Sequence, residues 1–195
     1  ADRDDPDYGL ILAFEDAQIN TTAIIESLDG LFVLSDATGD PLYREAALDA
    51  VRWVAGHAYM PGQGLFRASF DLDRRTYVPC PERADGHGAP ILDDGVFLTA
   101  FHLSGEVRYR EIAIQTADRL LSDEDPPGNW RCYAPVDPKT GALHPRCGWW
   151  WGRPLWRVAK ETGQQRYLDT CRRTARWYAA AMRTDGGMFR DTTPD

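Results

Sequence analysis

Two adjacent aspartates, Asp93 and Asp94, have the residue types of a general acid site. They lie at the start of an apolar stretch, residues 91–103, that is expected to form a helix. Adjacent carboxylates repel each other, and burial favours the protonated form that a general acid requires. The structural alternative is that they cap the helix, because Asp stabilises helix N-termini. The sequence leaves both interpretations open.

Aromatic residues gather around one arginine further along the chain. Three consecutive Trp residues cannot all lie on one helical face, so at least one is expected off the core, where sugar rings stack on exposed Trp faces. Arg153 is expected to open a helix, where the dipole disfavours a cation, and such a misplaced residue indicates function. The alternative is a salt bridge from Arg153 to Asp94 or Asp29. The aromatic residues are Trp149, Trp150, Trp151 and Trp156.

His87 lies in a loop-like segment, Asp-Gly-His-Gly, over residues 85–88. It is either a substrate contact or a solvated loop histidine. The sequence contains no phosphate-binding loop, H-E-x-x-H, G-x-S-x-G or dinucleotide fingerprint, so neither a metal nor a cofactor is expected. Cys132 and Cys147 flank a predicted turn over residues 137–141, which leaves a disulfide and two unpaired thiols as alternatives.

The composition is that of one globular domain over residues 1–195, with 43% hydrophobic and 27% charged residues. A net charge of −8 without a basic run argues against binding to nucleic acid or to an anionic membrane. No apolar run approaches the roughly 20 residues that cross a bilayer. Residues 1–5 lack the features of a signal peptide, so the protein is expected in the cytoplasm, or secreted after a signal peptide has been removed.

One element, Gly-x-x-x-Tyr, occurs three times, at residues 39–43, 105–109 and 163–167. Each Tyr begins an apolar stripe with the i, i+3, i+4, i+7 spacing of an amphipathic helix. A more apolar helix is expected before each element, over residues 24–35, 91–103 and 150–162. The stripes comprise Tyr43, Ala46, Ala47, Ala50, Val51 and Val54; Tyr109, Ile112, Ala113, Thr116, Ala117 and Leu120; and Tyr167, Thr170, Cys171, Thr174, Ala175 and Tyr178.

These pairs predict an all-α fold of three helical hairpins, with β-hairpin loops at residues 68–77 and 132–147. The period of about 60 residues is too long for tetratricopeptide, ankyrin or HEAT arrays and suits an (α/α) toroid. The inner helices would open at Asp29, Asp94 and Arg153. A ring of six hairpins needs about twice this length, so we expect half a ring: a fragment, a split gene product, a compact three-hairpin domain, or one partner of an assembly.

With this repeat, the chain resembles the six-hairpin glycosidase superfamily, and within it the unsaturated uronyl hydrolases and the related rhamnogalacturonyl hydrolases. Those proteins have a W-x-R-G-x-x-W element that opens an inner helix, and then T-G-D-x-x-Y before the outer helix. Residues 151–156, Trp-Gly-Arg-Pro-Leu-Trp, and residues 161–167, Glu-Thr-Gly-Gln-Gln-Arg-Tyr, are similar. Pro154 replaces the family's Gly, and the second Trp comes one residue early. The T-G-D-x-x-Y element recurs in helical-toroid sugar enzymes, including epimerases, so it supports the fold more than the activity.

The resemblance implies a glycoside hydrolase-like enzyme that acts on uronic-acid-containing oligosaccharides. Asp94 would be the general acid/base, with Asp16 or Asp29 as the second carboxylate. Arg153 would bind a uronate carboxylate or polar sugar groups, and the Trp residues would form a sugar platform. Further substrate contacts would come from Asp93 and His87.

Two alternatives from other classes stay open. A sugar epimerase or a polysaccharide lyase can have the same fold. Epimerases of this kind use His as acid/base, so substitution of His87 and His102 would distinguish an epimerase from a hydrolase. A non-catalytic carbohydrate-binding or structural half-toroid would bind glycan without turnover. Half a ring exposes apolar edges. In addition to an oligosaccharide substrate, we therefore expect self-association or a partner chain that completes the toroid.

Overall fold

The described part of the chain is mostly helical. The computed structural model describes residues 4–10, 18–26, 28–67, 69–78, 88–133 and 147–180, without the side chains of residues 18–20, 22–23 and 147–149. Within these ranges, no helix combines the length and the apolar character needed to cross a lipid bilayer.

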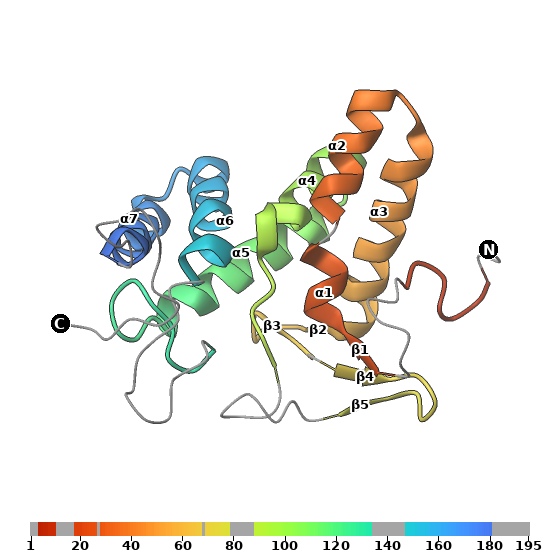
Figure 1. Ribbon diagram of the computed structural model, residues 1–195, viewed down its shortest axis with the longest axis horizontal. Coiled ribbons are helices and arrows are strands. Elements are labelled where there is room, and N and C mark those ends of the chain that lie inside the picture. Colours follow the sequence, from red (N-terminus) through yellow and green to blue (C-terminus); the bar gives the residue numbers. More distant parts are fainter. Residues whose placement is uncertain are drawn as a thin grey trace, which may run out of the picture.

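The helices pair into hairpins that follow one another across the molecule, from α2 and α3 to α6 and α7 (Figure 1). Within each hairpin the two helices pack along each other, and a short α1 (Thr21–Glu26) precedes the first. The predicted all-α fold of three hairpins is confirmed. The hairpins are α2 (Leu28–Thr38) with α3 (Pro41–Trp53), α4 (Val96–Ser104) with α5 (Val107–Ser122), and α6 (Cys147–Thr162) with α7 (Gln165–Ala180).

The repeated glycine ends the first helix of each hairpin. Gly39, Gly105 and Gly163 have φ of +72°, +74° and +70°, a left-handed conformation that strains any residue with a Cβ. Each donates its N–H to a carbonyl at the end of the preceding helix, namely that of Ser35, Phe101 or Ala159. The repeat seen in the sequence is therefore a repeated helix terminator, which ends the first helix of each hairpin in the same way.

The predicted outer-helix stripes are buried on α5 and only partly buried on α7. The α5 stripe is buried along its whole length: Tyr109, Ile112, Ala113, Thr116, Ala117 and Leu120. On α7, Tyr167, Thr170 and Thr174 are buried, whereas Ala175 and Tyr178 are exposed. In the last turn of α7, Trp177 contacts the neighbouring loop instead, since its Nε1 donates to the carbonyl of Pro127 (2.7 Å).

Short strands lie between the first two hairpins. β4 (Ser69–Asp71) pairs antiparallel with β5 (Thr76–Val78), with Phe70 opposite Tyr77, and with β1 (Gln18–Asn20) on its other side. This confirms the β-hairpin predicted at residues 68–77. β2 (Tyr59–Met60) and β3 (Leu65–Phe66) form a second pair. The other predicted hairpin, and with it the disulfide alternative for Cys132 and Cys147, depends on residues 134–146, which lie outside the described residues.

Trp151 lies in the core rather than on a surface. Only 4% of it is exposed. Its ring meets those of Trp130 and Tyr133 edge-on, with centroids 4.8 Å and 6.0 Å away. Trp130 is fully buried, and its Nε1 donates to the carbonyl of Leu120 (2.6 Å). This aromatic cluster joins the third hairpin to the end of α5.

Replacing Trp151 with Ala should therefore lower the free energy of unfolding by about 3–5 kcal/mol, the usual cost of removing a buried large aromatic side chain. Trp156, five residues later on the same helix, is 45% exposed, and its replacement with Ala should cost about 0.5 kcal/mol. Urea unfolding of the two variants measures the difference. Equal losses would contradict the assignment of Trp151 to the core.

Candidate functional site

The second of the two adjacent aspartates, together with Gly95, forms a left-handed turn before α4. Asp94 has φ 48° and ψ 6°, and Gly95 has φ 68° and ψ 33°. The carbonyl of Asp93 accepts the N–H of Val96, where α4 begins. The expectation that this inner helix opens at Asp94 is therefore wrong by two residues, because left-handed dihedrals cannot continue into a right-handed helix.

Gly95, and not an aspartate, occupies the N-cap position of α4. Asp93 is buried, whereas the Asp94 side chain is 35% exposed. The two aspartates therefore lie before the N-cap position of this helix. Residues other than Gly that are held in left-handed conformations collect at functional sites, where the surrounding structure compensates for the strain.

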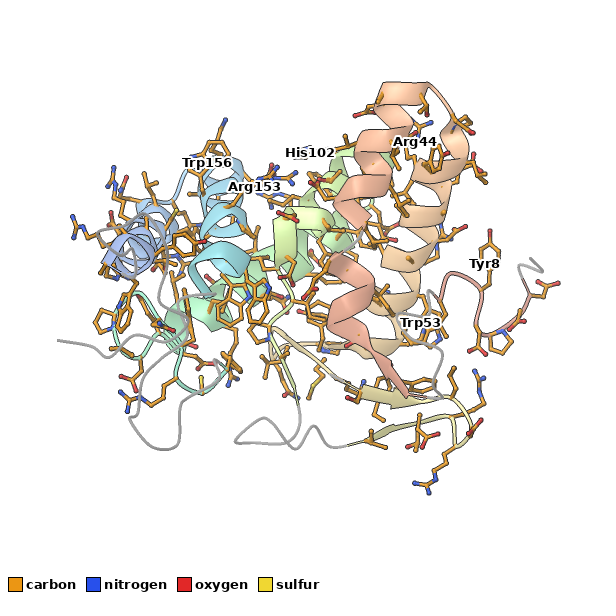
Figure 2. The ribbon with its side chains drawn as sticks, in the orientation of Figure 1. Tyr8, Arg44, Trp53, His102, Arg153 and Trp156 are labelled. Atoms are coloured by element: carbon orange, nitrogen blue, oxygen red, sulfur yellow. The ribbon has the colours of Figure 1, made fainter. Side chains whose placement is uncertain are left out.

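Asp29, Asp94 and Arg153 come together from three hairpins. From α6, Arg153 places Nη1 3.3 Å from Asp94 Oδ1 and Nη2 4.0 Å from Asp29 Oδ2. Asp29 lies in the first turn of α2. Figure 2 shows Arg153 on the side of α6 that faces α4. The Arg153 side chain is 60% exposed and that of Asp29 25%, so the group is open to a ligand.

The position of Arg153 in its helix differs from the prediction. α6 begins at Cys147, so Arg153 lies in the second turn and not at the helix start. The helix dipole fades within the first turn, and it therefore gives no argument for function at Arg153. The ion pairs to Asp94 and Asp29, which were the structural alternative, are confirmed.

Arg157, one turn later on α6, lies behind this group. Its Nη1 donates to the carbonyl oxygen of Asp94 (2.5 Å), and its Nη2 donates to Thr99 Oγ1 (2.7 Å). Burial lowers the pKa of the Arg157 guanidinium, and the nearby carboxylates of Asp29 and Asp94 oppose that change. The guanidinium remains charged, because arginine is not deprotonated in proteins. Sequence reasoning missed Arg157, although its spacing of four residues from Arg153 puts both on one helix face.

The Trp residues of α6 have different surroundings. Trp151 is buried, as described above, and offers no face to a sugar. Trp150 is half-buried beside it, with ring centroids 6.2 Å apart. Trp156 is exposed, and Lys160 Nζ lies 4.8 Å from its ring centroid. Trp156 is therefore the Trp of this helix best exposed for stacking among those whose side chains the structure describes.

A cleft of about 320 Å³ lies between α4 and α6, next to the Asp94 turn. At its far end, His102 Nε2 is 3.1 Å from Glu161 Oε2, and Glu161 Oε1 accepts a hydrogen bond from Arg110 Nε (2.7 Å). No sequence motif surrounds His102, and its pairing joins α4 to a residue 59 positions later, on α6. The cleft is lined by Leu98, His102, Trp156, Arg157, Lys160 and Glu161.

Asp16 and His87 lie outside the described residues, as does the side chain of Trp149, so their roles remain predictions. Of the two candidates for the second carboxylate, Asp29 is the one seen near Arg153. Over the residues described, no three His, Cys, Asp or Glu side chains are grouped in a way that could hold a metal ion.

If Asp94 and Arg153 serve a ligand rather than the fold, their removal should cost little stability. Asp94→Asn and Arg153→Met should each change the free energy of unfolding by less than about 1 kcal/mol, because exposed ion pairs contribute little. Glu124→Gln is the contrasting variant, because its carboxylate is 8% exposed and pairs with Arg173; it should cost about 3 kcal/mol. Urea unfolding compares the three, and losses as large at Asp94 as at Glu124 would indicate a structural role.

Known proteins resemble this chain in structure rather than in sequence. No protein-family model matches it, and no curated protein sequence does. A possible member of the GH105 family from Salmonella enterica matches with a TM-score of 0.67 at 13% identity, covering 92% of this chain and 48% of its own. Cellobiose 2-epimerase from Spirochaeta thermophila matches with a TM-score of 0.62 at 18% identity, and the match covers 90% of this chain and 50% of the epimerase. A glycosyl hydrolase family 88 protein from Bacteroides vulgatus matches with a TM-score of 0.57 at 16% identity, and the match covers 90% of this chain and 53% of the hydrolase.

Similarity at these identities shows the fold and not the activity. The chain spans about half the length of the solved structures that it matches. Three hairpins are half of the six that close such a ring, in agreement with that coverage. The chain therefore shares the helical-hairpin fold of these solved structures, over about half of each.

Proposed function

We propose that the protein is a glycoside hydrolase-like enzyme that acts on uronic-acid-containing oligosaccharides. The observation that carries this proposal is the group formed by Asp29, Asp94 and Arg153 at the ends of neighbouring inner helices. Two carboxylates beside an exposed guanidinium offer acid/base groups together with a binding partner for an acidic sugar. The likeness in fold to glycoside hydrolases adds support.

Each member of the group has a separate role in the proposed reaction. Asp94 acts as general acid/base, giving a proton to the substrate while water is added, and Asp29 assists as the second carboxylate. Arg153 binds the carboxylate of a uronate. Because Arg153 already contacts Asp94, an incoming uronate competes for the guanidinium and frees the Asp94 carboxyl to face the sugar.

The cleft beside the group is proposed to hold the rest of the oligosaccharide. Trp156 presents its ring there, and the apolar face of a pyranose stacks on such a surface. Lys160, placed over the same ring, adds a positive charge that favours acidic sugars. Asp93, His87, Trp149 and Trp150 remain proposed substrate contacts.

A sugar epimerase is the second candidate, and the His102–Glu161 pair favours it. A carboxylate that orients an exposed His is an arrangement suited to proton transfer, and a cellobiose 2-epimerase shares the fold. Product analysis separates the two reactions, because hydrolysis adds water and cleaves the chain whereas epimerisation keeps the mass. His102→Asn should abolish epimerisation and leave hydrolysis by Asp94 in place.

The chain is also proposed to associate with a partner that completes the ring, either a second copy or another chain. Its inner helices expose apolar side chains that a closed toroid would cover, including Val33 (59% exposed) and Leu34 on α2, and Leu103 on α4. Exposed apolar surface of this kind marks interaction sites. The active site would then open onto a cavity that both halves enclose.

The hydrolase proposal is tested by turnover and binding of an oligosaccharide with an unsaturated uronic acid at its end, alongside a neutral analogue. Asp94→Asn should lower kcat on the order of 10²–10⁴ while affinity is kept. Arg153→Ala should weaken binding of the acidic sugar more than of the neutral one. Asp36→Asn, an exposed change at the other end of α2, serves as the control. Unchanged turnover in Asp94→Asn would refute the role of Asp94.

The association proposal is tested by sedimentation of the 195-residue chain, whose monomer has a mass of 22.0 kDa. We expect species larger than the monomer. Val33→Asp should shift the distribution toward the monomer, because a charged side chain at this position opposes burial of the surface in an interface. Leu42→Asp, at an equally exposed position on outer helix α3, should have no such effect. A monomer at all concentrations would contradict self-association.

A further inference from the structure

The turn that carries Asp94 is held from outside by α6. We infer that Arg157 is a positioning residue, which fixes the left-handed Asp94–Gly95 turn and thereby directs the Asp94 carboxylate toward Arg153 and the substrate. This inference rests on the role proposed for Asp94, and it assigns a new role to a residue that does not touch the Asp94 carboxylate in the structure.

Two hydrogen bonds from Arg157 reach both sides of the turn. Nη1 donates to the main-chain carbonyl of Asp94, and Nη2 donates to Thr99 Oγ1, in the first turn of α4. The planar guanidinium offers donors in a fixed fork, so the two bonds set the position of the turn relative to the helix that follows. A lysine, with one ammonium on a flexible stem, cannot reproduce that fork.

Gly95 adds an independent observation. A Cβ built on Gly95 would lie 2.8 Å from Arg157 Cδ and 3.0 Å from its Nε, so the Arg157 side chain would have to shift to admit an alanine. The Arg157 side chain therefore runs directly against the turn. The positive φ of Gly95 also favours glycine, so packing and backbone conformation select the same residue.

Charged groups of both signs meet at the turn. The carboxylates of Asp29 and Asp94 lie near the guanidinium groups of Arg153 and Arg157, and Asp93 adds a buried carboxylate. Arg153 is exposed and pairs with the carboxylates of Asp29 and Asp94, whereas Arg157 is half-buried and donates to a carbonyl and a hydroxyl. One arginine is thus available to a ligand, and the other holds the scaffold.

Nuclear magnetic resonance of the free protein tests this without any substrate. Arg157→Met should shift the amide signals of Asp94, Gly95 and Val96 and raise the hydrogen-exchange rate of the Gly95 and Val96 amides by about 10-fold or more. Thr99→Val and Arg157→Lys, which each retain part of the fork, should move the same signals less. Arg173→Met is the matched control, because it removes a part-buried guanidinium that binds Glu124 away from the turn; the turn signals should stay in place.

A mutant cycle gives a second readout of the contact. Gly95→Ala should lower the melting temperature more in the wild-type background than in Arg157→Ala, because the collision with the Arg157 side chain is absent in the latter. Equal shifts in both backgrounds would overturn the packing role. If the Arg157→Met and Arg157→Ala variants do not fold, the turn signals of Thr99→Val and Arg157→Lys still decide the question.

Turnover distinguishes positioning from a purely structural role. With an acidic oligosaccharide as substrate, Arg157→Met should lower kcat on the order of 10² through misplacement of Asp94, with KM nearly unchanged, whereas Arg153→Ala should raise KM. Wild-type protein without turnover would refute the proposed function, and the magnetic resonance data would still decide the positioning role. Turnover with an undisturbed turn and unchanged kcat in Arg157→Met would overturn the inference alone.

Discussion

The contact between Arg157 and the turn at Asp94 is the interaction on which the candidate site depends. It joins the second hairpin to the third, since the guanidinium on α6 binds the carbonyl just before α4. It adds to the bonds that the turn makes within itself, from the Gly95 N–H to the carbonyl of Leu92 and from the Val96 N–H to the carbonyl of Asp93. The Asp94 carboxylate, its ion pair with Arg153 and the nearby Asp29 then follow from the packing of neighbouring inner helices.

The half-ring architecture is the second constraint. The same glycine terminator ends the first helix of each of the three hairpins described. Packing of each hairpin on the next gathers the inner-helix starts at one end, where Asp29 and the Asp94 turn meet Arg153. The same architecture leaves apolar side chains on the inner face, Val33 and Leu34 among them. The grouping of the site residues and the exposure of these apolar side chains thus have one origin.

Features that depend on neighbouring residues could be predicted from the sequence, whereas features that depend on distant residues could not. The Gly-x-x-x-Tyr elements predicted the hairpins because helix termination depends on a few adjacent residues. The approach of Arg153 to Asp94 and Asp29 followed from their places on successive inner helices. The left-handed Asp94 could not be predicted, because Arg157 stabilises it from a distant part of the chain. The burial of Trp151 was missed for the same reason, since Trp130 and Tyr133 enclose it.

The most direct measurement of the central claim is a chemical-shift map of the free protein during titration with a glucuronate-containing oligosaccharide. A site built on Asp29, Asp94 and Arg153 predicts saturable changes at the amides of these residues and at the Trp156 indole, with much weaker changes for a neutral oligosaccharide of equal length. Changes confined to other parts of the chain, or equal responses to the acidic and neutral sugars, would contradict it.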